Sequence, residues 1–243
     1  MKDDIYYIRG LTSTTYNNYD NHIAIYLALL SLHAYAKREG VYFKVVRAYL
    51  TDSDIEVFIQ QQNPTEIAEN GKIYFGILIT NNEVGKKAIT NELTYTYYDK
   101  DGHSFRGVTA NKVFKVNHRT AIRNVGRQLE NIDNLEKMKE DTLEQIHFML
   151  NHPVVNDNTL YEMVYREIDR RTKTFGPETR KKAREMYDEK HINNTFSIIK
   201  VFHHLSTITD DEDEKLNLER IYHDVLIRMN KRKREREKEA SQP

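Results

Sequence analysis

Cysteine and tryptophan are both absent from the 243 residues of the chain. Without cysteine the protein has no disulfide, no thiolate zinc site and no cysteine nucleophile. Long apolar runs are missing too: residues 23–36 form the most apolar stretch, which is shorter than the roughly 18 to 20 residues of a membrane span and contains His33. The first ten residues, MKDDIYYIRG, lack a signal-peptide pattern. These absences predict a cytoplasmic protein with no membrane partner.

Net charge is absent as well, because 37 lysines and arginines balance 37 aspartates and glutamates. No global field therefore draws the chain toward nucleic acid. The charges are nevertheless segregated along the sequence. Residues 102–129 contain no acid, whereas acids concentrate in TDDEDEKLNLE at residues 209–219. The cations within the acid-free segment are Arg106, Lys112, Lys115, Arg119, Arg123 and Arg127.

Residue patterns predict the order of the secondary structure. A helix is expected from Asp20, a plausible N-cap, to a stop at Gly40, and a strand over residues 41–50. Asp52 or Ser53 is then expected to cap a short helix that ends at Pro64. Alternating apolar residues predict a strand over 71–80, followed by strands over 91–98 and 103–116 that a turn at DKDG connects. A long helix from residue 120 to Pro153 and four further helices complete the pattern.

This order predicts an α+β fold, in which an antiparallel β-meander with a long packed helix is followed by a helical C-terminal third. We expect an α+β core domain over residues 1–153 and a helical region with a basic tail over residues 154–243. Because no low-complexity linker separates the two regions, the helical region could equally pack on the core as one domain.

No known catalytic or metal motif stands out. The chain lacks a glycine-rich phosphate loop, a G-x-S-x-G elbow and a helical histidine pair with the spacing of a zinc site. DKDG resembles part of a calcium loop, but Tyr97 and Val108 occupy positions that need oxygen ligands. We therefore predict no catalytic residues, no metal site and no cofactor. A hydrolase that uses Asp52, Asp54 and Glu83 is the weakest alternative, since no nucleophile accompanies these carboxylates.

The acid-free segment indicates a nucleic-acid surface. Arg119, Arg123 and Arg127 recur every four residues and would form one ridge on the expected long helix. Cations that contact phosphates, together with stacking from Phe105, Tyr95 or Tyr97, would bind a single strand. The alternative is a solvated helix face whose cations pair with acids from elsewhere, such as those of residues 209–219.

A further motif follows the strand expected over residues 71–80. Asn81, Asn82 and Glu83 precede Gly85, and asparagine and glycine tolerate left-handed backbone. We expect the motif to form a corner between two strands, with Glu83 bonding back to the freed amides.

Four blocks resemble a phage/plasmid-like protein family of unknown function: VVRAYLTDSD, FGILITNNEVGKKAI, FKVNHRTA and NTFSIIKVFHHLSTITDDEDEKLNLERIYHDVL. The family places an N-S-E-x-G motif after a strand, and here Asn82 replaces its serine. Thr51 replaces a second serine, and the C-T-N-G stretch of the family is absent. The residues that carry the resemblance are Arg47, Ala48, Leu50, Thr51, Asp52, Asn81, Asn82, Glu83, Gly85 and His118.

The resemblance implies a phage or mobile-element protein in the host cytoplasm. The expected topology is similar to that of phage single-strand annealing proteins, which act in recombination and assemble into rings or filaments. We therefore expect a non-catalytic DNA-metabolism protein that binds single-stranded nucleic acid and forms a homo-oligomer. The alternative is a protein-binding module that inhibits or redirects a host factor through the charged helices of residues 210–243.

Overall fold

The structure is a computed structural model that describes residues 16–17, 19–67, 71–84, 87–150, 157–188 and 198–240. The chain forms two compact units, each built from non-consecutive segments. Unit 1 comprises Met1–Gln62, Gly76–Glu92 and Asn111–Leu135, and unit 2 comprises Asn63–Phe75, Leu93–Ala110 and Glu136–Pro243. This division differs from the single boundary expected near residue 153, because parts of the strands belong to each unit.

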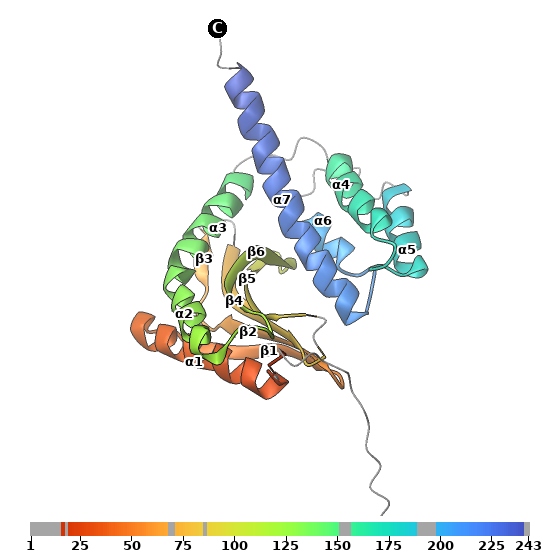
Figure 1. The fold of residues 1–243 in the computed structure, drawn as a ribbon. Helices are drawn as coiled ribbons and strands as arrows, with labels where there is room; N and C mark the ends of the chain where they lie inside the picture. Colours follow the sequence, from red (N-terminus) through yellow and green to blue (C-terminus); the bar gives the residue numbers. More distant parts are fainter. Residues whose placement is uncertain are drawn as a thin grey trace, which may run out of the picture. The chain divides into compact units, whose positions relative to one another are not determined.

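The strands form an antiparallel sheet with the order β1-β2-β4-β5-β6, and β3 pairs with β4 off this path (Figure 1). The α+β class is thereby confirmed. None of the described helices is long and apolar enough to cross a bilayer. The strands are β1 (Phe43–Leu50), β2 (Asp54–Gln61), β3 (Thr65–Ile67), β4 (Gly71–Asn82), β5 (Ile89–Tyr98) and β6 (Ser104–Val116).

The helices of unit 1 pack on one face of its strands. The helix α1 (Asn21–Glu39) begins after Asp20 and ends at Gly40, whose φ of 66° is left-handed, as the sequence predicts. Its buried side includes Ala24 and Ala28, whose small side chains permit close approach to the sheet. The remaining helical segments of the unit are η1 (Ile122–Asn124), α2 (Val125–Leu129) and η2 (Glu130–Asn134).

The short helix expected after residue 51 is wrong, because β2 occupies these residues. β2 pairs with β1 and with β4, and seven of its eight residues are buried. Thr51 makes the hairpin turn: its Oγ1 accepts the Asp54 N–H at 3.0 Å, and its own N–H donates to the Asp54 carbonyl at 3.0 Å. Thr51, the residue before the expected caps Asp52 and Ser53, therefore closes a β-hairpin.

The single long helix expected from residue 120 is also wrong in its first part. The chain passes through η1, α2 and η2 before α3 (Leu135–Leu150) begins. Turns of 3-10 helix and of α-helix therefore alternate in this part of the chain. β6, by contrast, is one uninterrupted strand of 13 residues, as expected over residues 103–116.

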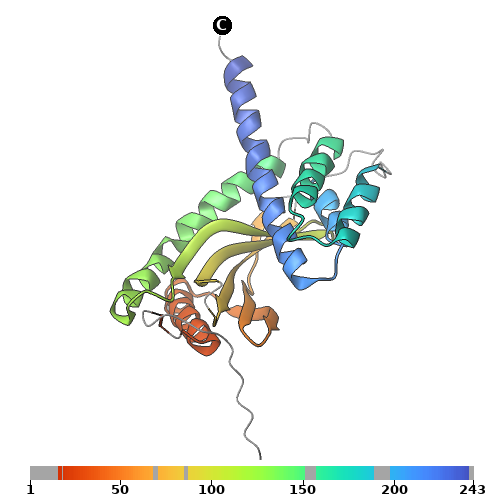
Figure 2. The same cartoon turned by 45° about the vertical axis from the view of Figure 1, so that its right-hand side comes forward.

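Unit 2 contains most of the helical content. Its helices after α3 are α4 (Asp157–Arg170), α5 (Pro177–Asp188), α6 (Ile198–Leu205) and α7 (Glu212–Ala240). Figure 2 shows α4 beside α5, and the C-terminal end of α7 extends away from both. The core of the unit is aromatic: the rings of Phe105 and Phe202 lie 5.0 Å apart, and Phe202 stacks on Tyr222 at 4.4 Å.

Candidate nucleic-acid interface

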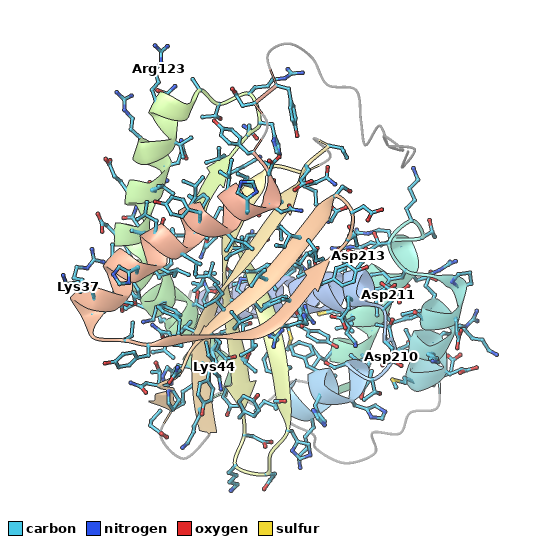
Figure 3. All side chains as sticks on the ribbon, turned by 90° about the horizontal axis from the view of Figure 1, so that it is seen from below. Lys37, Lys44, Arg123, Asp210, Asp211 and Asp213 are labelled. Carbon is cyan, nitrogen blue, oxygen red and sulfur yellow. The ribbon has the colours of Figure 1, made fainter. Side chains whose placement is uncertain are left out.

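Five of the six cations predicted to bind phosphates are exposed, and all five belong to unit 1. Lys112 and Lys115 lie on β6, Arg123 on η1 and Arg127 on α2. Arg119 lies in the turn before η1, where the Thr120 N–H donates to the Asn117 carbonyl at 2.8 Å. The predicted three-arginine ridge is therefore wrong, because Arg119 precedes the helical residues. Figure 3 shows Arg123 pointing away from its helical segment.

The five exposed cations, which we call the basic segment, form no ion pair with any described residue. Arg106 differs: in unit 2 its Nη1 lies 3.6 Å from Glu219 and its Nε donates to the Thr96 hydroxyl at 3.4 Å. The alternative, in which the acids of residues 209–219 neutralise these cations, therefore applies to Arg106 and to none of the basic segment.

The acids of residues 209–219 have other partners. Lys215 lies 3.1 Å from Glu212 and 4.0 Å from Asp210, and Glu214 accepts hydrogen bonds from three donors. These contacts lie within unit 2, so the carboxylates of Asp210, Glu212 and Glu214 have partners in their own unit.

The predicted stacking residues are buried, and this part of the predicted site is wrong. Tyr95 and Tyr97 are 0 % exposed and Phe105 is 3 % exposed. The Tyr95 ring packs edge-on to Phe105 at 6.1 Å, and its hydroxyl lies 3.3 Å from His223 Nδ1. Burial raises the pKa of Tyr95 far above its usual 10.0, so the phenol stays neutral. These rings build the core of unit 2 and offer no face to a base.

The asparagine motif ends a strand and anchors a helix. Asn81 and Asn82 belong to β4 and pair with Ile55 and Asp54 of β2, so the expected corner begins later than predicted. The Asn81 Nδ2 donates to the Tyr19 carbonyl at 2.9 Å and to the Asn21 Oδ1 at 3.1 Å. Gly85 lies outside the described residues.

Glu83 contacts the first turn of α1. Its Oε1 accepts the Asn21 N–H at 2.9 Å, and its carbonyl accepts the Tyr16 hydroxyl at 2.7 Å. Asp20, the N-cap residue, makes no side-chain capping bond. Glu83, which directly follows β4, therefore supplies the capping acceptor that a helix N-terminus needs, and its negative charge suits the positive end of the helix dipole.

We expect Glu83→Ala to lower the free energy of unfolding by about 1 to 2 kcal/mol, the usual effect of losing a helix cap. Glu83→Gln, which keeps an acceptor but loses the charge, should cost less than about 1 kcal/mol. Urea unfolding measures both changes, and equal losses in the two variants would contradict a capping role.

The DKDG residues form the predicted turn between β5 and β6. Asp99 Oδ1 accepts the N–H groups of Asp101 and His103 at 2.9 and 2.8 Å, and Gly102 has a φ of 86°. Ligand atoms of Asp99, Asp101 and His103 lie within 4.8 Å of one another, so these three residues are the group in the described chain that could hold a metal ion. The hydrogen bonds that close the hairpin explain the position of the Asp99 carboxylate without a metal ion.

Large apolar side chains gather on the surface of unit 1. Among the described residues, eight of the nine exposed large apolar side chains lie on α1, on β1 or between them, including Tyr26, Tyr42 and Leu50. β1 is an edge strand, so its outer backbone groups lie at the edge of the sheet, beside apolar side chains that alternate between the two faces of the strand. Such surfaces are typical of contact with another chain. The homo-oligomer and the protein partner stay predictions.

Unit 2 also contains an arginine cluster that was not among the expected site residues. Glu167 of α4 is buried and pairs with Arg170 at 2.5 Å, with Arg171 at 3.3 Å and with Arg228 of α7 at 2.8 Å. Burial would raise the pKa of the Glu167 carboxyl, but the Arg228 hydrogen bond and the nearby guanidiniums lower it below its usual 4.5. The spacing of Glu167, Arg170 and Arg171 indicates the helical part of the cluster, whereas nothing local indicates Arg228.

No protein-family model matches the chain, and searches of the curated proteins and of the solved structures find no match. The resemblance to the phage/plasmid-like family therefore stays a prediction, and the site has to be interpreted from its own geometry.

Proposed function

We propose that the chain is a non-catalytic DNA-metabolism protein that binds single-stranded nucleic acid through the basic segment. The observation that carries the proposal is the exposure of Lys112, Lys115, Arg119, Arg123 and Arg127 without an ion-pair partner among the described residues. Cations without a partner in the fold gain most from phosphates, because neither an internal ion pair nor a buried environment has to be given up.

Binding by this surface is expected to depend mainly on phosphate contacts. With Tyr95, Tyr97 and Phe105 buried, base stacking by these rings contributes nothing. The preference for a single strand, the phage or mobile-element origin and a role in the host cytoplasm are supported by the sequence resemblance. A duplex of the same sequence is therefore the necessary comparison.

A salt titration tests the proposal. If all five cations contact phosphates, log affinity for a single strand should fall with log salt concentration with a slope of about 3.5, which is 0.7 for each contact. Arg123→Gln combined with Arg127→Gln should reduce the slope by about 1.4 and weaken binding at low salt. Fluorescence anisotropy with a labelled oligonucleotide measures both quantities.

A matched control removes two arginines from unit 2. Arg166 and Arg184 are exposed and pair with Glu162 and Asp188 on their own helices. The Arg166→Gln and Arg184→Gln pair changes the net charge equally, yet should leave the slope unchanged. The proposal fails if the chain binds no oligonucleotide at low salt, or if both double variants weaken binding equally. Tighter binding of the duplex would remove the single-strand assignment.

A further inference from the structure

The arginine cluster of unit 2 lines a pocket of about 410 Å³ between α4 and α7. This volume lies within the roughly 300 to 1,000 Å³ of small-molecule sites. The charged and polar lining of the pocket comes from Glu167, Arg170, Arg171, His223, Asp224 and Arg228. Every lining residue belongs to unit 2.

The wall of the pocket is positively charged. Three arginines face two carboxylates, those of Glu167 and Asp224, which leaves one positive charge in excess. Burial raises the pKa of the Asp224 carboxyl, whereas the positive charges of Arg171, Arg228 and Arg220 lower it. Burial lowers the pKa of His223 to about 4, so the imidazole is neutral at neutral pH and adds none.

The guanidiniums keep donors for a ligand. Each arginine side chain has about five N–H groups, so the three arginines of the pocket have about fifteen in total. Arg170 uses Nη2 on Glu167, and Arg171 reaches Glu167 and, at 3.9 Å, Asp224. Arg228 uses Nη1 on Glu167 and Nε on the Asp224 carbonyl. Most N–H groups of the three side chains thus have no acceptor among the described residues, while Glu167 holds the guanidiniums close together.

We propose that this pocket binds a phosphate monoester, with its dianionic phosphate held by Arg170, Arg171 and Arg228. A tetrahedral dianion offers three oxygens to the guanidinium forks, and the net positive wall attracts it. Ala110, Ile227 and the neutral His223 ring give the pocket a less polar part that can hold the organic group of the ester. The phosphate can come from a small metabolite or from the phosphorylated end of a nucleic acid.

Calorimetric titration of the full chain with methyl phosphate and dimethyl phosphate provides the first test. The two probes share their chemistry, but the diester has one negative charge and fewer free oxygens. We expect methyl phosphate to bind at least about tenfold more tightly, the difference that one charge-assisted hydrogen bond supplies. Equal affinities, or no detectable binding of methyl phosphate, would overturn the proposal.

Variants on α4 locate the site. Arg170 and Arg166 are comparably exposed, at 71 % and 75 % of the side chain, but only Arg170 lines the pocket. Arg170→Gln should weaken methyl phosphate binding about tenfold, and Arg166→Gln should change it less than about twofold. Arg228→Lys keeps the charge but loses the planar fork, so it should also weaken binding. Equal effects of Arg166→Gln and Arg170→Gln would show general charge attraction instead of a site.

The source of the phosphate is distinguished with AMP and with an oligonucleotide that carries either a 5′-phosphate or a 5′-hydroxyl. These titrations use the Arg123→Gln, Arg127→Gln background, in which the basic segment is weakened. Selective binding of AMP identifies a small-molecule site, and selective binding of the phosphorylated oligonucleotide identifies a nucleic-acid end. The pocket shares no residue with the basic segment, so each proposal can fail while the other holds.

Discussion

Glu214→Ala is expected to lower the free energy of unfolding of unit 2 by about 3 to 5 kcal/mol. The Glu214 carboxylate is buried and accepts hydrogen bonds from the Gly176 N–H at 2.6 Å and from the hydroxyls of Thr179 and Thr209 at 2.5 Å each. Removing it leaves three donors unsatisfied, at about 1 to 3 kcal/mol each, although the hydroxyls can rotate toward other acceptors. Because Gly176 and Thr179 flank the start of α5, the change also removes an anion from the positive end of that helix.

Urea unfolding followed by circular dichroism measures this loss. The matched control is Asp210→Ala, which removes a nearby exposed carboxylate and should change stability by less than about 0.5 kcal/mol. Similar losses in the two variants would show that charge, and not the three hydrogen bonds, sets the effect.

The same carboxylate makes the stability of unit 2 depend on pH. Burial alone would raise the pKa of Glu214, but the hydrogen bonds from Gly176, Thr179 and Thr209 lower it below its usual 4.5. The contribution of the ionised group is therefore complete above pH 4.5 and is lost as the pH falls through the folded-state pKa. The stability difference between the parent chain and Glu214→Gln should shrink over this acidic interval.

Gly107→Ala is expected to destabilise unit 2 by about 3 kcal/mol or more. An added methyl group would lie 2.3 Å from Tyr95 Cζ and 2.4 Å from its hydroxyl oxygen, well inside van der Waals contact. The Tyr95 ring is fully buried against Phe105 and His223, so it cannot move aside without disturbing the aromatic core. Overpacking of this kind typically costs about 1 to 3 kcal/mol. The cost should lie at or above the upper end here, because the buried Tyr95 ring cannot shift to relieve the clash.

Gly126→Ala is the matched control for this prediction. Gly126 lies in α2, and nothing stands within 4 Å of an added methyl group. Alanine is a better helix former than glycine, so this variant should gain up to about 1 kcal/mol. Thermal unfolding compares the two variants, and a loss in both would contradict the steric explanation for Gly107.

The elements that could be predicted from the sequence are those determined by local chemistry. The end of α1 follows from the left-handed Gly40, and the Asp99 turn follows from its own side-chain bonds. The cap at the start of α1, by contrast, comes from the distant Glu83 and not from Asp20. β2 was missed because the Thr51 hydroxyl bonds an N–H three residues later in a hairpin turn just as a capping side chain does at a helix start. Only the pairing of β2 with β1 and β4 distinguishes the two cases.

The candidate site was predictable in its cations but not in its aromatic residues. An acid-free stretch is visible in the sequence, and five of its six cations, all except Arg106, have no ionic partner among the described residues. The burial of Tyr95 and Phe105, however, is created by Phe202, Tyr222 and His223, more than ninety residues further along the chain. The arginine pocket likewise depends on Arg228 meeting α4, which no local spacing reveals.

The segments of the two units are interleaved along the chain, and this order restricts how the protein can be divided. The chain passes from one unit to the other after Gln62, Phe75, Glu92, Ala110 and Leu135. No single cut in the gene yields either unit whole: a fragment ending at residue 153 would retain β3 and parts of β4, β5 and β6 without the helices that complete unit 2. A single truncation therefore cannot separate the two units, so the two proposed sites are best tested by point substitution within the intact chain.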